Sequence, residues 1–364
     1  MRITELELAQ LRNIERATLE TDSPTVLIGG PNAAGKTTLL EGIYLLLAGR
    51  SFRTREATKL IRTGHQNCWA TARIGEAFLG ASRSADGRPV HRLNAADLSL
   101  AELVRHFPVM LLDNSVFALF EGPPQYRRQL IDWGLFHVKH AFYSQWRHYR
   151  HALKQRNALL KNASPDPAQI DVWDAKLAPS GECIDRWRTA YIADLSTHCE
   201  QSPLLDGLNL EFSYARGWAG ETTLPFAAAL RQARQRDIRQ RHTGLGPQHA
   251  DLRITVTEAG KAGDRLSRGQ KKLAAFAVKL EQLRMYNRQS PAPAFLLVDD
   301  IAAELDTDTQ RCILRYIETL GSQVFMTSIE PERLAALLSP TVQAQARMFH
   351  VKHGCLVQPA HSNP

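Results

Sequence analysis

Residues 30–37 read Gly-Pro-Asn-Ala-Ala-Gly-Lys-Thr and fit the pattern G-x-x-x-x-G-K-[ST]. They follow a short apolar run at residues 25–28, which predicts a strand. They precede residues 38–48, where apolar side chains recur at helical spacing, and Gly49 is placed to end that helix. In this order of strand, loop and helix, loop N–H groups and the helix N-terminus can bind phosphate. A plain glycine turn is the alternative interpretation.

The loop predicts a binding site for ATP and Mg²⁺. We expect the Lys36 ammonium to reach the β- and γ-phosphate oxygens and the Thr37 hydroxyl to bind Mg²⁺. The residues of this segment expected to contact nucleotide are Gly30, Pro31, Asn32, Ala33, Ala34, Gly35, Lys36, Thr37 and Thr38.

A pair of acids follows a second apolar run. Residues 295–298 (FLLV) read as a buried parallel strand and lead into Asp299 and Asp300. P-loop enzymes carry their second metal-positioning acid at the end of such a strand. We therefore expect Asp299 to hold Mg²⁺ through water and Asp300 to polarise the attacking water as a general base. Two acids that merely cap a strand end are the alternative.

A long helix is predicted from Ser267 to about Tyr286, and residues 266–270 (LSRGQ) lie at its start. These residues resemble the L-S-G-G-Q signature of ABC-type ATPases, with Arg268 in place of the first glycine. In those ATPases the signature serine faces the γ-phosphate bound by the other subunit. Ser-x-x-Gln before an apolar helix is also a capping box, and both interpretations can hold together.

The signature resemblance therefore implies that Ser267, Gly269 and Gln270 contact nucleotide across a dimer, and it adds Ser267 to the expected catalytic residues Lys36, Asp299 and Asp300. The metal ligands are expected to be Thr37 and Asp299. Residues 303–306 (AELD) match the loop that crosses to the opposite site in such dimers.

Composition agrees with a folded, basic protein. The chain has 364 residues, 44% of them hydrophobic and 23% charged, which suits two globular lobes. Its formal net charge of +8 favours a polyanionic partner, either nucleic acid or an anionic membrane surface. Five separated cysteines without a C-x-x-C pair predict neither disulfides nor a zinc ribbon. A charged N-terminus and short apolar runs favour a soluble, cytoplasmic protein without membrane association.

The predicted fold class is α/β, an ABC-type P-loop ATPase head with a second, mainly helical lobe. Residues 1–112 are expected to form the first part of the nucleotide-binding lobe and residues 290–355 its second part. Residues 113–289 would form the helical lobe and carry the signature, and residues 356–364 a flexible tail. Further strands are predicted at residues 2–8, 67–93, 208–214, 252–257 and 323–327, and helices at 125–200, interrupted at 164–167, and at 226–241.

Several separated blocks resemble the RecF family of SMC-like, ABC-type ATPases. They are residues 11–15 (LRNIE), 49–54 (GRSFRT), 122–128 (GPPQYRR), 132–134 (DWG), 153–157 (LKQRN), 246–247 (GP) with 250–253 (ADLR), 266–270 (LSRGQ), and 299–300 (DD) with 304–306 (ELD). The resemblance implies an ATP-dependent DNA-binding protein of recombinational repair and replication restart, active in the SOS response. It implies binding to single-stranded and duplex DNA at gaps and junctions, an ATP-dependent homodimer, weak DNA-stimulated ATPase activity, and work with RecO and RecR to load recombinase.

Some positions depart from that family. Ala33 stands where a second loop glycine is usual, which would stiffen the phosphate loop. Residues 112–115 (LDNS) replace a segment that commonly contains Pro-Glu, so the residue there that senses the γ-phosphate stays open. Gln248 and His249 stand where a histidine followed by a basic residue is usual. Thr327 and Ser328 occupy the switch position without a histidine, as in the family.

Clusters of basic residues are candidates for neutralising DNA phosphates, although solvated helix faces are an equally good explanation for any one of them. The candidates are Arg127, Arg128, Arg147, Arg150, Lys154, Arg156, Arg231, Arg234, Arg236, Arg239 and Arg241. No base-reading motif is visible, which predicts binding that depends on DNA shape rather than sequence.

The ATPase subunit of a membrane ABC transporter is the alternative function. Transporter ATPases share the phosphate loop, the signature and the strand carboxylates. In this chain, however, 231 positions separate Lys36 from Ser267, whereas only 32 separate Ser267 from Asp299. Transporter ATPases keep the first gap much shorter. A purely structural SMC-like tether would need a coiled-coil arm, and a small-molecule kinase would leave the signature unexplained.

Overall fold

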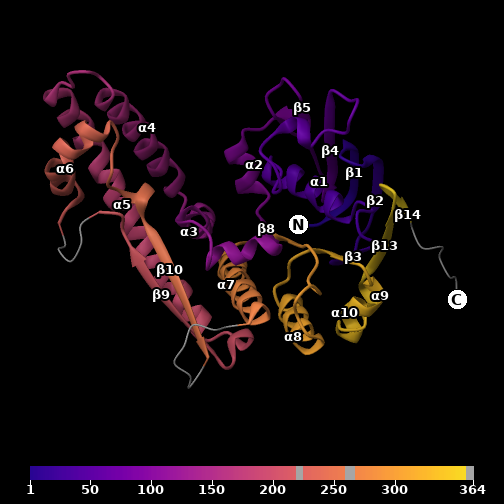
Figure 1. Cartoon of the computed structure of the whole chain (residues 1–364). Coiled ribbons are helices and arrows are strands. Elements are labelled where there is room, and N and C mark those ends of the chain that lie inside the picture. The colour runs from indigo at the N-terminus through magenta and orange to yellow at the C-terminus, as the bar shows by residue number, and fades with distance from the viewer. Residues whose placement is uncertain (219–223, 259–266, 358–364) are drawn as a thin grey trace, which may run out of the picture. The chain divides into compact units, whose positions relative to one another are not determined.

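The chain forms two compact units in a computed structural model that describes residues 1–218, 224–258 and 267–357. Unit 1 combines Met1–Val116 with the described part of Ser267–Pro364, and unit 2 is Phe117–Leu266 (Figure 1). Unit 1 is therefore built from the two ends of the chain, and unit 2 is inserted between them.

Two six-stranded sheets form the framework of unit 1. The first is antiparallel, with the order β2-β1-β4-β5-β6-β7. The second has the order β14-β13-β3-β12-β11-β8 and is parallel except for its β13–β14 hairpin. The strands are β1 Ile3–Leu11, β2 Ile14–Glu20, β3 Thr25–Gly29, β4 Asn67–Ile74, β5 Ala77–Ser84, β6 Val90–Leu93, β7 Ala96–Asp97, β8 Val109–Leu112, β11 Phe295–Val298, β12 Val324–Ser328, β13 Arg347–Lys352 and β14 Cys355–Val357.

Helix α1, Lys36–Ala48, packs against strands of both sheets. Its leucines and Ile43 are buried all around the helix, as expected for a helix covered on opposite sides. Gly42 permits this packing, because an added Cβ would lie 2.5 Å from the Leu8 side chain of β1. Gly49 ends the helix in a left-handed conformation with φ 66°, as predicted. The remaining helices of unit 1 are α2 Leu100–His106, α7 Arg268–Gln289, α8 Thr307–Glu318, α9 Pro331–Ala335 and α10 Pro340–Gln345, with 3-10 turns at Ala57–Lys59 and Asn114–Leu119.

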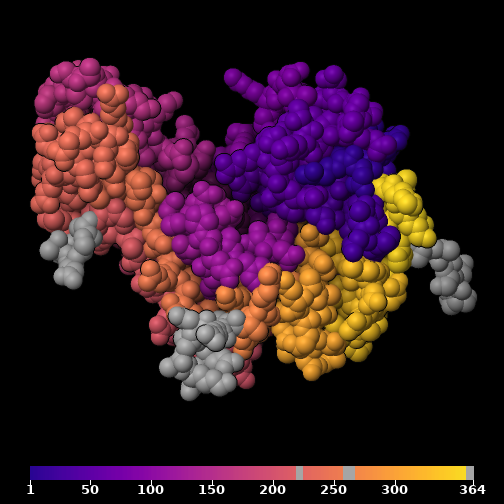
Figure 2. Space-filling model, viewed as in Figure 1, coloured from indigo at the N-terminus to yellow at the C-terminus, as the bar shows by residue number. Residues whose placement is uncertain are grey.

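The central strand of the parallel sheet is β3, which leads into residues 30–37. Both of its neighbours, β12 and β13, come from the C-terminal part of the chain. Figure 2 shows the N-terminal part of unit 1 (indigo to purple) and its C-terminal part (light orange to yellow) lying against each other. Because the carboxyl ends of parallel strands meet at one sheet edge, the segments after β3, β11 and β12 converge there.

Unit 2 is mainly helical. The short connection between α4 and α5 places these two long helices side by side (Figure 1), and α5 also packs against the antiparallel ribbon of β9 and β10. The elements are α3 Pro124–Val138, α4 Phe142–Leu160, α5 Pro167–Glu200, α6 Phe226–Gln240, β9 Leu208–Ala215 and β10 Asp251–Glu258, with 3-10 turns at Pro203–Leu205 and Pro247–His249. Nowhere in the described chain is a helix both long and apolar enough to cross a membrane.

Most predicted elements are confirmed. Strands β8, β13 and β14 and helices α2, α8, α9 and α10 were not predicted, and the helical block expected at 125–200 has a further break between α3 and α4. Three other points differ. Strand β2 was not predicted, so three strands rather than two precede the loop. Helix α7 was expected in the helical lobe but belongs to unit 1, because its apolar residues are buried and it packs on β8. Of the expected tail, residues 356 and 357 lie in β14, and residues 358–364 lie outside the described residues.

Candidate nucleotide-binding site

The loop between β3 and α1 contains backbone conformations with positive φ that favour glycine. Gly30 and Gly35 have φ values of 148° and 120°, and a Cβ on Gly30 would lie 2.4 Å from the Val351 carbonyl oxygen. Ala33 also adopts a left-handed conformation, with φ 62°. For a residue with a Cβ, this conformation costs roughly 1 kcal/mol, so Ala33 carries local strain in the phosphate loop.

Asn13, from the turn between β1 and β2, supports the loop from outside. Its Nδ2 donates to the Ala33 carbonyl at 3.3 Å, and its Oδ1 accepts from the Thr38 hydroxyl at 3.0 Å. The Gly354 N–H of the β13–β14 turn donates to the Ala34 carbonyl at 2.8 Å. Asn13 was noted in the sequence only as part of a family block. Its contact with the loop depends on a turn that periodicity did not predict.

Lys36 folds back over the loop. Its Nζ donates to the carbonyls of Gly30 at 2.8 Å and Pro31 at 3.0 Å. Burial lowers the pKa of Lys36, against the opposing pull of Asp300 and Asp299. A lysine held by two neutral carbonyls at this position can exchange them for phosphate oxygens, which are the stronger acceptors.

Thr37 and Asp299 meet, as the predicted metal site requires. The Thr37 hydroxyl lies 3.0 and 3.2 Å from the two Asp299 carboxylate oxygens. Thr327, at the end of β12, donates its hydroxyl to Asp299 at 2.7 Å. Burial raises the pKa of Asp299, although the hydrogen bonds from Thr327 and Thr37 favour its charged form. Hydroxyl and carboxylate oxygens are ligands that Mg²⁺ prefers, so these residues fit that ion.

Asp300 has a backbone held in an uncommon conformation, with φ 52°. Its N–H donates to the Thr327 hydroxyl oxygen at 3.0 Å, and its carbonyl accepts from Lys272 Nζ at 3.2 Å. Aspartate tolerates the left-handed region better than most residues. These two hydrogen bonds hold the main chain of Asp300 in place. Its side chain is partly exposed and follows Asp299 directly in the chain.

Lys272, on α7, was not predicted as part of the site. Its Nζ donates to the carbonyls of Asp300 and, at 2.6 Å, Ala303, and the residue is fully buried. Burial lowers the pKa of this ammonium, against the opposing pull of Asp300. A signal was available in the sequence, because positions 272, 276, 279 and 283 form one face of a helix, and Phe276 and Leu283 are apolar. A lysine on such a face needs a buried partner.

The signature residues start α7 as a capping box. The Ser267 hydroxyl accepts from the Gln270 N–H at 3.1 Å, and the Gln270 side chain accepts from the Ser267 N–H at 2.8 Å. Gly269 lies against Glu304, where an added Cβ would come within 2.9 Å of the carbonyl oxygen. Arg268 pairs with the Glu304 carboxylate at 2.9 Å. Leu266 lies outside the described residues.

The structure therefore brings the phosphate loop together with Asp299 and Asp300. The signature residues contact Glu304, in the segment 303–306, rather than the phosphate loop of the same chain. Within the described part of the chain, no hydrogen bond links Ser267 or Gly269 to residues 30–37. Asp306 serves as the N-cap of α8, accepting from the N–H groups of Asp308 at 3.0 Å and Thr309 at 2.9 Å.

Comparison with known proteins identifies the family. Residues 2–356 match the RecF/RecN/SMC N terminal domain family. The DNA replication and repair protein RecF of Pseudomonas fluorescens (strain SBW25) is 35% identical over 366 residues, which are 98% of each chain. RecF of Yersinia pseudotuberculosis serotype O:1b (strain IP 31758) is 36% identical over 369 residues, 99% of each chain. The chain belongs to the RecF family.

Solved structures show the same fold. The recombination mediator protein RecF-ATP of the RecFOR pathway superposes with a TM-score of 0.82 at 24% identity, covering 98% of this chain and 97% of that one. The Smc head domain of Pyrococcus furiosus, solved with an extended coiled coil bound to the C-terminal domain of ScpA, gives 0.56 at 17% identity, covering 98% and 96%. The predicted ABC-type ATPase head with a helical lobe is confirmed, and the transporter alternative receives no support from these matches.

Several basic residues expected to contact DNA in this RecF-family chain have structural roles in unit 2. Arg156 is fully buried and pairs with Asp174 at 2.6 Å and with Asp237 at 2.8 Å. Arg127 is buried and binds both carboxylate oxygens of Asp251, at 2.8 and 3.0 Å. These two predictions are wrong, because a buried guanidinium with carboxylate partners cannot reach a phosphate. Arg128 donates to the Ala250 carbonyl, and Arg234 pairs with Asp171 and Asp174.

Proposed function

We propose that this chain is an ATP-dependent DNA-binding protein of recombinational repair and replication restart. It binds single-stranded and duplex DNA at gaps and junctions and helps to load recombinase together with RecO and RecR. One observation carries the proposal: the full-length likeness to DNA replication and repair proteins named RecF extends over a chain whose phosphate loop and acids form one site. The net charge of +8 agrees with a polyanionic partner.

The proposed chemistry assigns one role to each residue of the site. Lys36 leaves its two carbonyl acceptors and binds the β- and γ-phosphate oxygens, and the loop N–H groups bind the remaining oxygens. Thr37 and Asp299 hold Mg²⁺, which supplies positive charge to the phosphates. Asp300 accepts a proton from the attacking water. The Asp300 side chain is one methylene shorter than that of a glutamate, so it would hold the attacking water less well. We therefore infer slow hydrolysis, in which the lifetime of bound ATP sets how long the ATP-bound state lasts.

The proposed switch is ATP-dependent dimerisation, in which Ser267, Gly269 and Gln270 complete the site of a second copy. The start of α7 supports this role. Ser267 is exposed, and its hydroxyl takes part in the capping box of α7. An exposed helix N-terminus favours an anion such as the γ-phosphate.

Binding to DNA with and without ATP tests the proposed function. We expect measurable affinity for gapped, duplex and single-stranded DNA that increases with ATP and falls steeply between 50 and 200 mM salt, as phosphate neutralisation requires. Fluorescence anisotropy with labelled DNA of each type measures these affinities. The absence of DNA binding under every condition would contradict the proposal.

Ser267→Arg is expected to abolish ATP-dependent dimerisation while ATP still binds, because a bulky cation replaces the hydroxyl at the shared contact. Light scattering measures the dimer, and calorimetry measures ATP binding. Mixing this variant with Lys36→Ala should restore part of the association, since one of the two composite sites then has both intact residues. A mixture that associates no better than either variant alone would rule out the shared site.

Ser99→Arg is the matched control for the lost helix cap. Ser99 caps α2 in the same way, with its hydroxyl 3.3 Å from the Glu102 N–H and its own N–H 2.9 Å from the Glu102 carboxylate. Either substitution loses about 1 kcal/mol of capping energy. Only Ser267→Arg should prevent the dimer.

A further inference from the structure

A basic groove of about 770 Å³ lies on unit 2, and none of its lining residues belongs to the nucleotide site. Helix α4 supplies most of its lining, including the cations Arg150 and Lys154 and the amide of Asn157. The C-cap residue of α4 adds the cation Lys161, and the 3-10 turn Pro247–His249 adds the amide of Gln248. No carboxylate is among these lining side chains, and their one ring, the imidazole of His151, packs against Trp173 at 5.7 Å between ring centroids.

The cations form a regular stripe. Positions 150, 154, 157 and 161 are spaced i, i+4, i+7 and i+11, which places them on one face of a continuous helix. The stripe is about 16 Å long, from the helical rise of 1.5 Å per residue. Arg150, Lys154 and Lys161 are exposed. Within residues 1–218, 224–258 and 267–357, no carboxylate forms an ion pair with any of them, although Arg150 also lies over the Trp146 ring.

The two amides are held in place by a buried network. Asn157 Oδ1 accepts from the N–H of Thr243 at 2.8 Å and from its hydroxyl at 2.7 Å. Gln248 Oε1 accepts from the Tyr149 hydroxyl, and its Nε2 donates to the Leu245 carbonyl at 2.9 Å. These contacts use the Asn157 oxygen and leave its Nδ2 hydrogens available for an acceptor in the groove.

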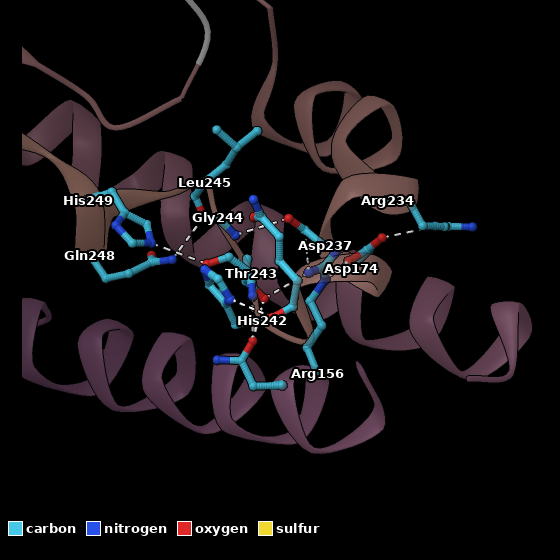
Figure 3. A network of polar contacts seen from close by, with 12 residues as sticks. Arg156, Asp174, Arg234, Asp237, His242, Thr243, Gly244, Leu245, Gln248 and His249 are labelled. Carbon is cyan, nitrogen blue, oxygen red and sulfur yellow. Dashed lines mark hydrogen bonds and ion pairs between the residues drawn. The ribbon is translucent and has the colours of Figure 1, made fainter. Parts of the chain in front are cut away.

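The buried Arg156 side chain stabilises this network. Figure 3 shows its guanidinium among Thr243, Asp174 and Asp237, and Arg156 Nη1 donates to the Thr243 hydroxyl at 2.8 Å. The fully buried arginine therefore fixes the loop that orients Asn157. Preorganised donors lose little entropy when they bind a ligand.

We propose that this groove binds the sugar-phosphate backbone of a DNA strand, an inference that rests on the proposed DNA-binding function. Cations and amide N–H groups are donors for phosphate oxygens. A stripe of about 16 Å matches roughly five phosphates of one strand at 3.4 Å per phosphate along the helix axis. The lining has one ring, His151, which packs against Trp173, and so offers no row of platforms on which successive bases could stack. The groove therefore holds the strand through its backbone, without reading sequence.

The test neutralises the stripe in the full-length protein with Arg150→Gln, Lys154→Gln and Lys161→Gln together. Each charge that contacts phosphate contributes about 0.9 to the slope of log affinity against log salt on duplex DNA, so that slope should become shallower by about 2.7. At fixed salt we expect DNA affinity to fall at least about tenfold, equally for unrelated sequences, while ATP affinity is unchanged. Anisotropy titrations from 50 to 200 mM KCl provide these values.

Lys139→Gln, Lys176→Gln and Arg186→Gln provide the control. These residues are exposed in the same unit and are not among the candidates for DNA contact, and the triple substitution removes the same charge. It should leave the salt slope nearly unchanged. Asn157→Asp is a second, independent variant, because its carboxylate still accepts both Thr243 hydrogen bonds while it places a negative charge in the groove. We expect it to weaken DNA binding with the fold intact.

The outcomes separate the two proposals. A wild-type protein that binds no DNA overturns the proposed function. If the wild type binds DNA and the groove variant has the same affinity and salt slope, only the groove assignment is overturned. An equal loss in the control variant overturns it as well. A groove variant that keeps DNA binding but no longer binds an acidic Asp/Glu peptide would assign the groove to a protein partner instead.

Discussion

Replacing Lys36 with alanine should weaken ATP binding at least about a hundredfold while the protein stays folded. The ammonium is the charge that the structure places over the loop, and losing one charge-assisted phosphate contact costs about 3 kcal/mol. The fold should survive, because the side chain donates only two hydrogen bonds to carbonyls, each worth about 1 kcal/mol. Isothermal calorimetry with ATP and Mg²⁺ measures the affinity, and circular dichroism checks the fold.

Lys59→Ala is the matched control for Lys36→Ala. Lys59 is an exposed lysine of the same unit whose ammonium pairs with Glu56 at 2.9 Å, so its loss removes an equal charge without touching the loop. It should bind ATP like the wild type. Unchanged affinity in a folded Lys36→Ala protein would mean that the phosphates bind elsewhere.

Asp300→Asn should lower ATP turnover by about a hundredfold to ten-thousandfold while ATP binding and dimerisation persist. The range is the usual contribution of a general base. Asparagine suits this position because it tolerates the left-handed backbone that Asp300 adopts at φ 52°. The main-chain hydrogen bonds to Thr327 and Lys272 do not involve the carboxylate and remain. Phosphate release under saturating ATP measures turnover.

Asp308→Asn is the control for the general-base assignment. Asp308 is an exposed acid in the first turn of α8, paired with Arg311 at 2.6 Å. Its neutralisation should not change turnover. Hydrolysis at the wild-type rate in Asp300→Asn would remove Asp300 from the chemistry.

Local patterns were enough to predict the order of strand, loop and helix and the contact between Thr37 and Asp299. A phosphate loop needs a strand before it and a helix after it, and residues 25–48 show both in sequence. Asp299 was predictable because a parallel strand presents its acid at the carboxyl edge, where β3 also ends. The contact between Thr37 and Asp299 then follows from two local patterns and one rule of sheet topology.

The supporting residues could not be predicted in the same way. Thr327 and Asn13 reach the site through strand order and turn geometry, which are long-range features. The role of Lys272 was overlooked because a lysine side chain is ordinarily expected at the solvent-exposed surface. Arg156 was misassigned for the same reason. Basic residues on α4 look alike in sequence, and only the positions of Asp174 and Asp237 separate the buried arginine from the exposed stripe.

The position of β3 between β12 and β13 has a consequence for protein synthesis. The phosphate loop leaves the ribosome roughly 310 residues before β13 does, which is about 15 to 60 s of translation at 5–20 residues per second. During that time α1, whose leucines are buried on opposite sides of the helix in the folded protein, has no strands of the parallel sheet beside it other than β3 and β8. Unit 2, continuous from Phe117 to Leu266, emerges whole within the same interval. The nascent chain can thus fold its inserted unit first, while the unfinished ATPase half is the part that most needs protection from aggregation.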